Sequence, residues 1–411
     1  MAGEKAAENG FSLPLADARG SVTPSESLAA FKQADEGVER LTQLRIGINA
    51  LYLLPGGVGG TEIYLRSLLA ALCEADTVNR YVVFVNHETG EGLDACAPGF
   101  RFVRCAVKAT SRPARILFEQ FALPGLLERH EIDVLLNPGF TMPALSRCPS
   151  VTVFHDLQHK RHPGFFKKLD LVFWNLLLWL AAARSRSLIA VSPATAADLE
   201  NFLPASRGKI RVIPHGVDPE LFRIGQRRGE TDPYILTAST LHPHKNLDRL
   251  LDAFHRFRKS HSEYRLVIAG LKGFATDKII AHANLLGLGD SVEFTGWIPR
   301  EDLYRLFERA SAFIYPSLFE GFGMPVSEAL AAGIPTACSA IAPLDWVGGD
   351  AAAFFGPFNT EAIVDAMELI TGDEAFRRRA ATAGPAQARR FDWSHCAAAT
   401  RDELERQARP R

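Results

Sequence analysis

Several features that mark common protein classes are missing from this sequence of 411 residues. Its charges nearly cancel, with 46 Lys and Arg against 47 Asp and Glu, which argues against a general nucleic-acid-binding protein. The six cysteines, at positions 73, 96, 105, 148, 338 and 396, show no paired short spacing, so they predict no zinc site and fit a reducing compartment. The segment Met1 to Glu39 has no apolar core of the kind found in signal peptides. We therefore expect a cytoplasmic protein without nucleic-acid partners.

A membrane-spanning stretch is missing as well. The apolar segment Leu169–Ala183 has fifteen residues, which is too short to cross a bilayer. Lysines precede it at 167 and 168, and arginines follow it at 184 and 186. Two interpretations stay open: a core helix that leads into a strand at Ser187–Val191, or a helix that lies peripherally on the anionic inner face of the plasma membrane.

The length and the order of the predicted elements indicate two domains. From Leu44 onward, short runs of branched apolar residues alternate with helical segments, which predicts an α/β protein with parallel sheets. Residues 1–42 are rich in Ala, Glu and Ser, and we expect a disordered tail there. A polar stretch at 223–232 indicates a linker, so the predicted domains are 43–222 and 223–390.

The most informative stretch of the sequence runs from Phe313 to Cys338. It predicts a buried strand, a glycine-bearing turn and a helix that begins near Pro325, because proline suits the first helical position. Such a turn presents free backbone N–H groups and the positive end of a helix dipole. It can therefore bind a phosphate group.

Two carboxylates flank this turn, Glu320 before it and Glu328 inside the helix. Both would point into the crevice at the carboxyl ends of a parallel sheet, where open α/β folds bind ligands. Carboxylates are poor ligands for phosphate but good acceptors for sugar hydroxyls. The pattern thus predicts a site for a sugar joined to a phosphate; the alternative is a pair of glutamates that only cap and solvate a helix N-terminus.

Two further segments place polar or glycine-rich groups at the ends of strands. A strand over Leu44–Ala50 is followed by the loop Pro55–Gly60 and a helix through Leu72. Taken alone, such a loop is as often plain topology as function. The strand from Ser150 ends in His155 and Asp156, on the ligand side of a parallel sheet. The alternative for His155 is a side chain that satisfies local backbone groups.

The run Glu-Gly-Phe-Gly-Met-Pro-x-x-Glu at 320–328 closely resembles the motif of retaining glycosyltransferases of family 4. Members have two facing Rossmann-like domains of the GT-B type, with the donor in the interdomain cleft. The resemblance implies a nucleotide-sugar donor whose sugar hydroxyls bind Glu320 and whose ribose binds Glu328. It also implies a final helix, here within 391–411, that crosses back to the first domain. The implied donor-binding residues of the two loops are Gly59, Gly60, Gly321, Phe322, Gly323, Met324 and Pro325.

The same resemblance assigns roles to residues outside the central motif. It places His155 near the donor sugar, and it places Lys245, in a Pro-His-Lys-Asn segment, against the diphosphate. An ammonium group there stabilises the charge that develops on the leaving group. The predicted catalytic residues are therefore His155, Lys245 and Glu320. The sequence departs from the commonest family pattern at Thr240, a predicted donor contact, because many members carry arginine there.

An Asp-x-Asp pair, the usual carboxylate seat for a divalent metal on a sugar nucleotide, is missing from the sequence. We therefore predict transfer without a metal ion or other cofactor. The residues also offer no clear nucleophile of the kind that retaining glycosidases use. The resemblance implies instead a front-face attack in which the departing phosphate takes the acceptor's proton.

The donor and acceptor are predicted from finer likenesses. The Gly-Gly-x-Gly-Gly-Thr-Glu and Thr-Leu-x-Pro-x-Lys-Asn segments resemble those of bacterial mannosyltransferases of surface-polysaccharide assembly. GDP-mannose is the first candidate donor and UDP-glucose the second, with a saccharide or lipid-linked saccharide as acceptor. The alternatives are an inverting or epimerising enzyme of the same architecture, a pyridoxal-phosphate-dependent phosphorylase, and a non-catalytic nucleotide-sugar sensor or partner subunit.

Overall fold

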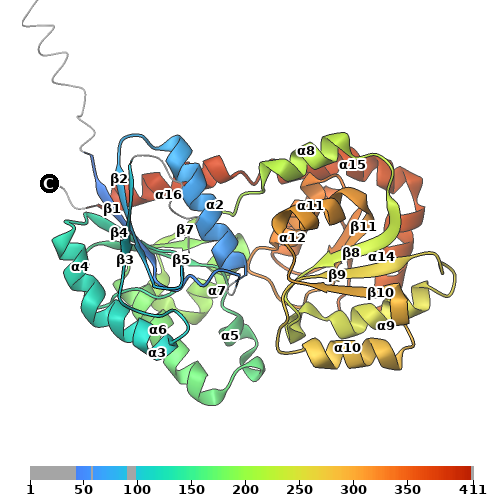
Figure 1. The fold of residues 1–411 in the computed structure, drawn as a ribbon, viewed down its shortest axis with the longest axis horizontal. Coiled ribbons are helices and arrows are strands. Elements are labelled where there is room, and N and C mark those ends of the chain that lie inside the picture. The colour runs from blue at the N-terminus through green and yellow to red at the C-terminus, as the bar shows by residue number, and fades with distance from the viewer. Residues whose placement is uncertain (1–42, 57–58, 90–98, 409–411) are drawn as a thin grey trace, which may run out of the picture. The chain divides into compact units, whose positions relative to one another are not determined.

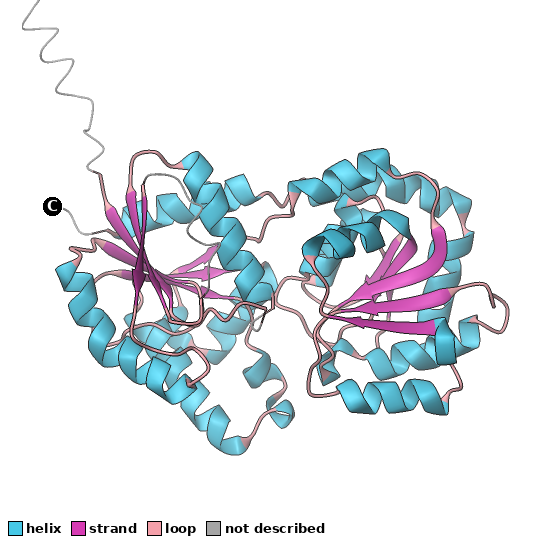
Figure 2. Cartoon of the chain, viewed as in Figure 1, coloured by secondary structure: helices cyan, strands magenta, loops and turns pink. Residues whose placement is uncertain are grey.

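The computed structural model describes residues 43–56, 59–89 and 99–408. The tail that we predicted at 1–42 lies outside them. The described chain builds two β-sheets, each with helices on both faces (Figures 1 and 2). This arrangement confirms the predicted α/β class with two Rossmann-like domains.

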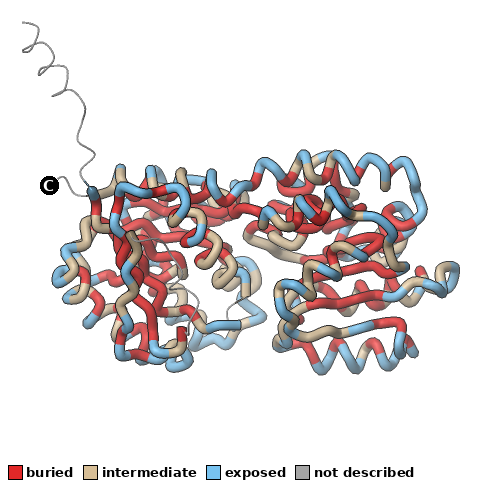
Figure 3. Tube along the Cα trace, turned by 45° about the horizontal axis from the view of Figure 1, so that its top comes forward, coloured by how far each residue is buried: buried red, intermediate tan, exposed pale blue. Residues whose placement is uncertain are grey.

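Both sheets are parallel throughout their described strand pairs. The strands of the first sheet are β1 (Arg45–Ala50), β2 (Arg80–Val85), β3 (Phe100–Arg104), β4 (Val134–Asn137), β5 (Ser150–Phe154), β6 (Ser187–Ala190) and β7 (Ile210–Val212). Those of the second are β8 (Asp232–Ala238), β9 (Arg265–Ala269), β10 (Val292–Gly296), β11 (Ala310–Tyr315), β12 (Thr336–Ser339) and β13 (Ala353–Phe355). Helices cover both faces of the central strands, so most residues of these strands are apolar. The tube in Figure 3 shows these strands buried.

The strand order of each sheet fixes where a ligand can bind. The first sheet runs β3-β2-β1-β4-β5-β6-β7 and the second runs β10-β9-β8-β11-β12-β13. In both, the order reverses once, between β1 and β4 in the first sheet and between β8 and β11 in the second. The loops after such neighbouring strands lead to opposite sides of the sheet and leave a crevice at the strands' carboxyl ends.

The helices follow the predicted order. In the first sheet's part of the chain they are α2 (Gly60–Ala75), α3 (Arg112–Leu117), α4 (Leu123–Arg129), α5 (Gln158–Arg161), α6 (Lys168–Arg184) and α7 (Pro193–Phe202). In the second they are α8 (Pro219–Arg227), α9 (Leu247–Phe257), α10 (Thr276–Leu285), α11 (Arg300–Arg309), α12 (Met324–Ala331), α13 (Leu344–Gly348), α14 (Thr360–Gly372) and α15 (Glu374–Ala388). The last helix is α16 (Trp393–Gln407).

Between α3 and α4 the chain forms a π-helical segment, η1 (Phe118–Ala122). One local expectation needs correction. The polar stretch predicted as a linker at 223–232 is helical in its first half, because α8 continues to Arg227. Asp218 caps this helix by accepting a hydrogen bond from the backbone N–H of Glu220 at 2.9 Å. Its apolar side contacts α11, α12 and α15, so α8 packs as part of the second domain.

The chain passes between the domains twice, and the two passages pair with each other. Val217 forms an isolated parallel bridge with Asp392, and its N–H donates to the carbonyl of Phe391 at 3.1 Å. After this point α16 packs against α2, β4 and β5. The final helix therefore returns to the first domain. A Cβ at Gly216 would lie 2.2 Å from the backbone nitrogen of Trp393, so only glycine permits this approach.

We predict that Gly216→Ala destabilises the protein because the added methyl group must displace the backbone at Trp393. The expected loss of unfolding free energy is about 1–3 kcal/mol. Gly229→Ala is the matched control, since a Cβ at Gly229 meets no atom within 4 Å. The measurement is urea unfolding followed by circular dichroism. Equal midpoints for the two variants would contradict the packing described here.

Candidate active site

The predicted catalytic lysine and glutamate meet where the second sheet reverses its strand order. Lys245 ends the short turn η4 (Pro243–Lys245) after β8, and Tyr315 is the last residue of β11. The Lys245 Nζ donates to Glu320 Oε1 at 2.6 Å and to the Tyr315 hydroxyl at 2.9 Å. Burial, with the nearby Glu320 charge, raises the pKa of Tyr315, which keeps its hydroxyl protonated. The side chains of Lys245 and Glu320 are only 14% and 11% exposed.

The glycine turn of the central motif makes a close contact with the end of β5. A Cβ at Gly321 would lie 1.7 Å from the carbonyl oxygen of His155, so no other residue fits without movement. The carbonyl of Gly321 accepts hydrogen bonds from Ser192 Oγ at 2.6 Å and from Thr195 Oγ1 at 3.1 Å. Gly323 adopts a φ of 100° and precedes α12. The turn is thus held by residues of the first domain.

The first glycine loop lies beside this turn. A Cβ at Gly60, the first residue of α2, would be 3.1 Å from the Met324 Cε atom. Gly59 has a φ of 58°, in the left-handed region that favours glycine. The structure therefore brings the predicted loop residues Gly59 and Gly60 to the predicted donor turn. The Phe322 side chain is instead buried among the rings of His215, Trp346 and Phe391.

His155 is buried, and both of its ring nitrogens have partners. Its Nε2 lies 2.8 Å from the carbonyl oxygen of Pro138, so Nε2 carries the hydrogen and Nδ1 accepts. His215 Nε2 lies 3.2 Å from that Nδ1 and acts as its donor. Burial lowers the pKa of His155 to about 4 and lowers that of His215 well below its usual range, so both rings are neutral at pH 7. The sequence analysis missed His215, and the role of His155 at the donor sugar stays a prediction.

Burial shifts the pKa values of two neighbours of Lys245 toward their uncharged forms. Burial, then the charge of Lys245, lowers the pKa of His244 to about 2. Its Nδ1 lies 2.6 Å from the side-chain amide nitrogen of Gln158. Burial raises the pKa of Asp156, whose Oδ1 accepts from the backbone N–H of Gln158 at 2.9 Å. Lys245 is therefore the cation that dominates this part of the site. Thr240, a predicted donor contact, follows β8 and is partly exposed.

The predicted ribose ligand, Glu328, sits on α12 with its side chain 10% exposed. Its Oε1 accepts a hydrogen bond from Arg300 Nη2 at 2.9 Å. Sequence reasoning did not single out Arg300, because it lies 28 positions away and belongs to no glycine-rich motif.

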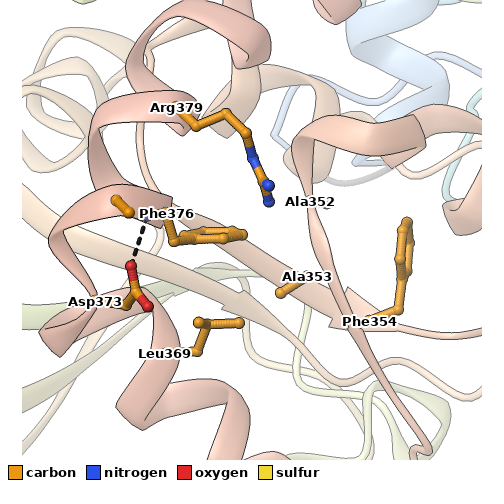
Figure 4. Close-up of a pocket in the computed structure, with 8 residues that line it drawn as sticks. Ala352, Ala353, Phe354, Leu369, Asp373, Phe376 and Arg379 are labelled. Carbon is orange, nitrogen blue, oxygen red and sulfur yellow. Dashed lines mark hydrogen bonds between the residues drawn. The ribbon is translucent and has the colours of Figure 1, made fainter.

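A pocket of about 550 Å³ lies elsewhere in the second domain, beside the edge strand β13. Figure 4 shows it between Phe354, Phe376 and Arg379. None of the predicted site residues lines it. The predicted site residues lie instead on loop ends and glycine turns at the strand termini.

Two family models cover most of the chain. Residues 58–221 match the model "Glycosyltransferase Family 4", and residues 219–387 match "Glycosyl transferases group 1". The boundary between the two matches falls at α8, where the chain enters the second sheet. The chain is a glycosyltransferase of the GT-B type.

Individual relatives agree with this class. The O-antigen chain mannosyltransferase B of Escherichia coli is 28% identical over 275 residues, covering 64% of this chain and 72% of that protein. The glycogen synthase of Mycobacterium tuberculosis is 26% identical over 336 residues, covering 79% and 80%. Among solved structures, sucrose-phosphate synthase from Thermosynechococcus elongatus has a TM-score of 0.74 at 19% identity, over 89% of this glycosyltransferase and 99% of that chain. That last likeness concerns the fold.

We predict that the buried histidine pair makes this glycosyltransferase less stable in mild acid. The pKa of His155 is about 4 when folded and about 6.5 when unfolded, so below pH 6.5 the unfolded chain binds a proton that the native chain does not. Stability is therefore lost as the pH falls from about 6.5 toward 4. In His155→Gln, the drop in unfolding free energy between pH 7.5 and 5.5 should shrink by about 1 kcal/mol.

Urea unfolding at the two pH values measures this difference. His395→Gln, which removes an exposed histidine, is the control. An undiminished drop in His155→Gln would mean that His155 does not resist protonation in the folded protein.

Proposed function

We propose that this glycosyltransferase transfers a hexose, with retention of anomeric configuration and without a metal ion, from a nucleotide sugar to a saccharide acceptor. The observation that carries the proposal is the contact of Lys245 with Glu320 beside the glycine turn. A cation and a carboxylate lie there at the carboxyl ends of β8 and β11, where the strand order reverses. A diphosphate and the sugar that it carries require these two groups side by side.

The proposed chemistry assigns one task to each group. Lys245 would bind the diphosphate and stabilise the charge that grows on it as the bond to the anomeric carbon breaks. Glu320 would hold hydroxyls of the donor sugar, and Glu328 those of the ribose. The acceptor oxygen bonds to the anomeric carbon on the face that the diphosphate leaves, and the acceptor proton passes to a departing phosphate oxygen.

A feature of the sequence supports transfer without a metal ion. The sequence has no Asp-x-Asp pair, the usual carboxylate seat for a divalent metal on a sugar nucleotide. With Thr240 at the position where many family members carry arginine, Lys245 and the N–H groups at the start of α12 would neutralise the leaving group.

We infer that the donor is GDP-mannose and the acceptor a saccharide or lipid-linked saccharide of surface-polysaccharide synthesis. The E. coli O-antigen relative supports mannose, and UDP-glucose stays the alternative donor. A non-catalytic nucleotide-sugar-binding protein is the alternative from another class. The buried, mutually paired Lys245 and Glu320 favour the enzyme, because a pre-positioned cation serves the leaving group of a reaction.

Calorimetric titration tests the donor site directly. We expect GDP-mannose to bind with a micromolar Kd in the presence of EDTA, and Lys245→Ala to weaken that binding and to lower turnover by about 100-fold or more. Lys278→Ala is the matched control, since that lysine is exposed on α10. Binding of UDP-glucose alone would select the alternative donor. A need for divalent metal, or binding without turnover on any saccharide acceptor, would contradict the corresponding part of the proposal.

We also infer that the protein works in the cytoplasm and touches the inner face of the membrane through α6. One side of α6 is buried through Leu177, Leu178 and Ala181. The other side exposes large apolar side chains, namely Leu169 (86%), Val172 (71%), Phe173 (41%), Leu176 (52%) and Trp179 (52%). A helix that is apolar on all sides is normally covered, and the basic residues at its ends suit an anionic lipid surface. Within the described residues, no helix is long and apolar enough to cross a bilayer.

Vesicle sedimentation tests the contact. We expect the protein to bind vesicles of phosphatidylglycerol and phosphatidylcholine, and the triple variant Leu169→Ser, Val172→Ser, Leu176→Ser to lose at least about tenfold in affinity. Leu285→Ser, which changes an 85% exposed leucine on α10, should bind as the wild type does. Equal binding by the triple variant and the control would exclude α6 as the membrane contact.

A further inference from the structure

Glu328 has a basic partner that the family resemblance did not supply. We propose that Arg300 is a positioning residue that fixes Glu328 for recognition of the donor's ribose hydroxyls. This inference rests on the proposed function, since it requires a nucleotide at Glu328. It adds to that function a residue on a different helix, α11, which acts through the carboxylate and not by touching the donor.

Arg300 contacts one of the two oxygens of the Glu328 carboxylate. Its Nη2 donates to Glu328 Oε1 at 2.9 Å. The hydrogen bonds found for Glu328 among the described side chains involve Oε1, which leaves Oε2 available to a ligand. A carboxylate fixed through one oxygen presents the other in a set direction, and a pair of ribose hydroxyls needs such an acceptor.

The charge of Arg300 also matters to Glu328. The Glu328 side chain is 10% exposed and that of Arg300 is 33% exposed, so the pair is well shielded from water. Burial opposes the charge of Arg300, but Glu328 and then Tyr304 outweigh it and raise the pKa of Arg300. The arginine therefore stays charged beside the carboxylate. Removing it would leave a buried carboxylate without its ionic partner, which is costly.

Two further groups keep Arg300 in place. Its guanidinium lies over the Tyr304 ring, with 5.0 Å from Cζ to the ring centre. The Nη2 atom also lies 3.4 Å from Asp218 Oδ2, and the Tyr304 hydroxyl donates to the same oxygen. Because Asp218 caps α8 through its other oxygen, the guanidinium is tied to the segment where the chain enters the second domain. Tyr304 and Asp218 thus fix the position of Arg300, which in turn contacts Glu328.

Nucleotides with and without ribose hydroxyls separate this role from a merely structural one. The probes are GDP and 2′,3′-dideoxy-GDP, titrated by calorimetry into the full-length protein. In Arg300→Gln we expect GDP affinity to fall about tenfold and dideoxy-GDP affinity to stay as in the wild type. Arg305→Gln is the matched control on the same helix, because Arg305 is 71% exposed and pairs with Asp302 on the surface. In a Glu328→Gln background, Arg300→Gln should add no further loss for GDP.

Each other outcome counts against a specific claim. Equal losses for GDP and dideoxy-GDP in Arg300→Gln would make Arg300 a general structural residue and overturn the inference, while the proposed function stands. An unchanged GDP affinity in Arg300→Gln would also overturn the inference and leave the proposed function in place. If the wild type binds uridine nucleotides instead, UDP and its dideoxy form replace the guanosine pair with the same expectations. Failure of the wild type to bind any nucleotide would overturn the proposed function and the inference together.

Discussion

The missing side chain of Gly321 is the constraint on which the site depends. The position where its Cβ would stand is 1.7 Å from the His155 carbonyl oxygen, so the donor turn can sit against the end of β5 only with glycine there. Ser192 and Thr195 then hold the turn by its carbonyl oxygen. With the turn fixed, Glu320 stands before it and Glu328 follows in α12. The backbone positions from which these side chains extend are therefore set by packing.

Within that frame, Lys245 and Glu320 neutralise each other through their ion pair. Both are largely buried, and an unpaired charge in such a place would be costly. A diphosphate would bring its own negative charge and could take over the lysine, which releases Glu320 to accept hydrogen bonds from the sugar. The ion pair would thus keep both groups charged until a diphosphate binds to the lysine. Arg300 and Glu328 form a second ion pair at the proposed ribose position, and there the arginine stays on the carboxylate.

Local patterns predicted much of this molecule because they act over short stretches. The glycine turn, the start of α12 and the strands before them follow from residue types at fixed spacing, and the structure contains them. Arg300 and His215 could not be found in the same way. Their partners are 28 and 60 positions away, and an arginine after proline or a histidine before glycine has no local meaning. The second half of α8, residues 223–227, was missed because its polar sequence resembles a linker, although α8 packs its apolar side against α11, α12 and α15.

The central proposal is that the diphosphate of a nucleotide sugar replaces Glu320 as the ionic partner of Lys245. A crystal structure of the protein with GDP bound tests it most directly. We expect a phosphate oxygen within about 3 Å of Lys245 Nζ, with the ion pair to Glu320 lengthened beyond 2.6 Å. A diphosphate bound away from Lys245, for example in the pocket beside β13, with the ion pair unchanged, would contradict the account.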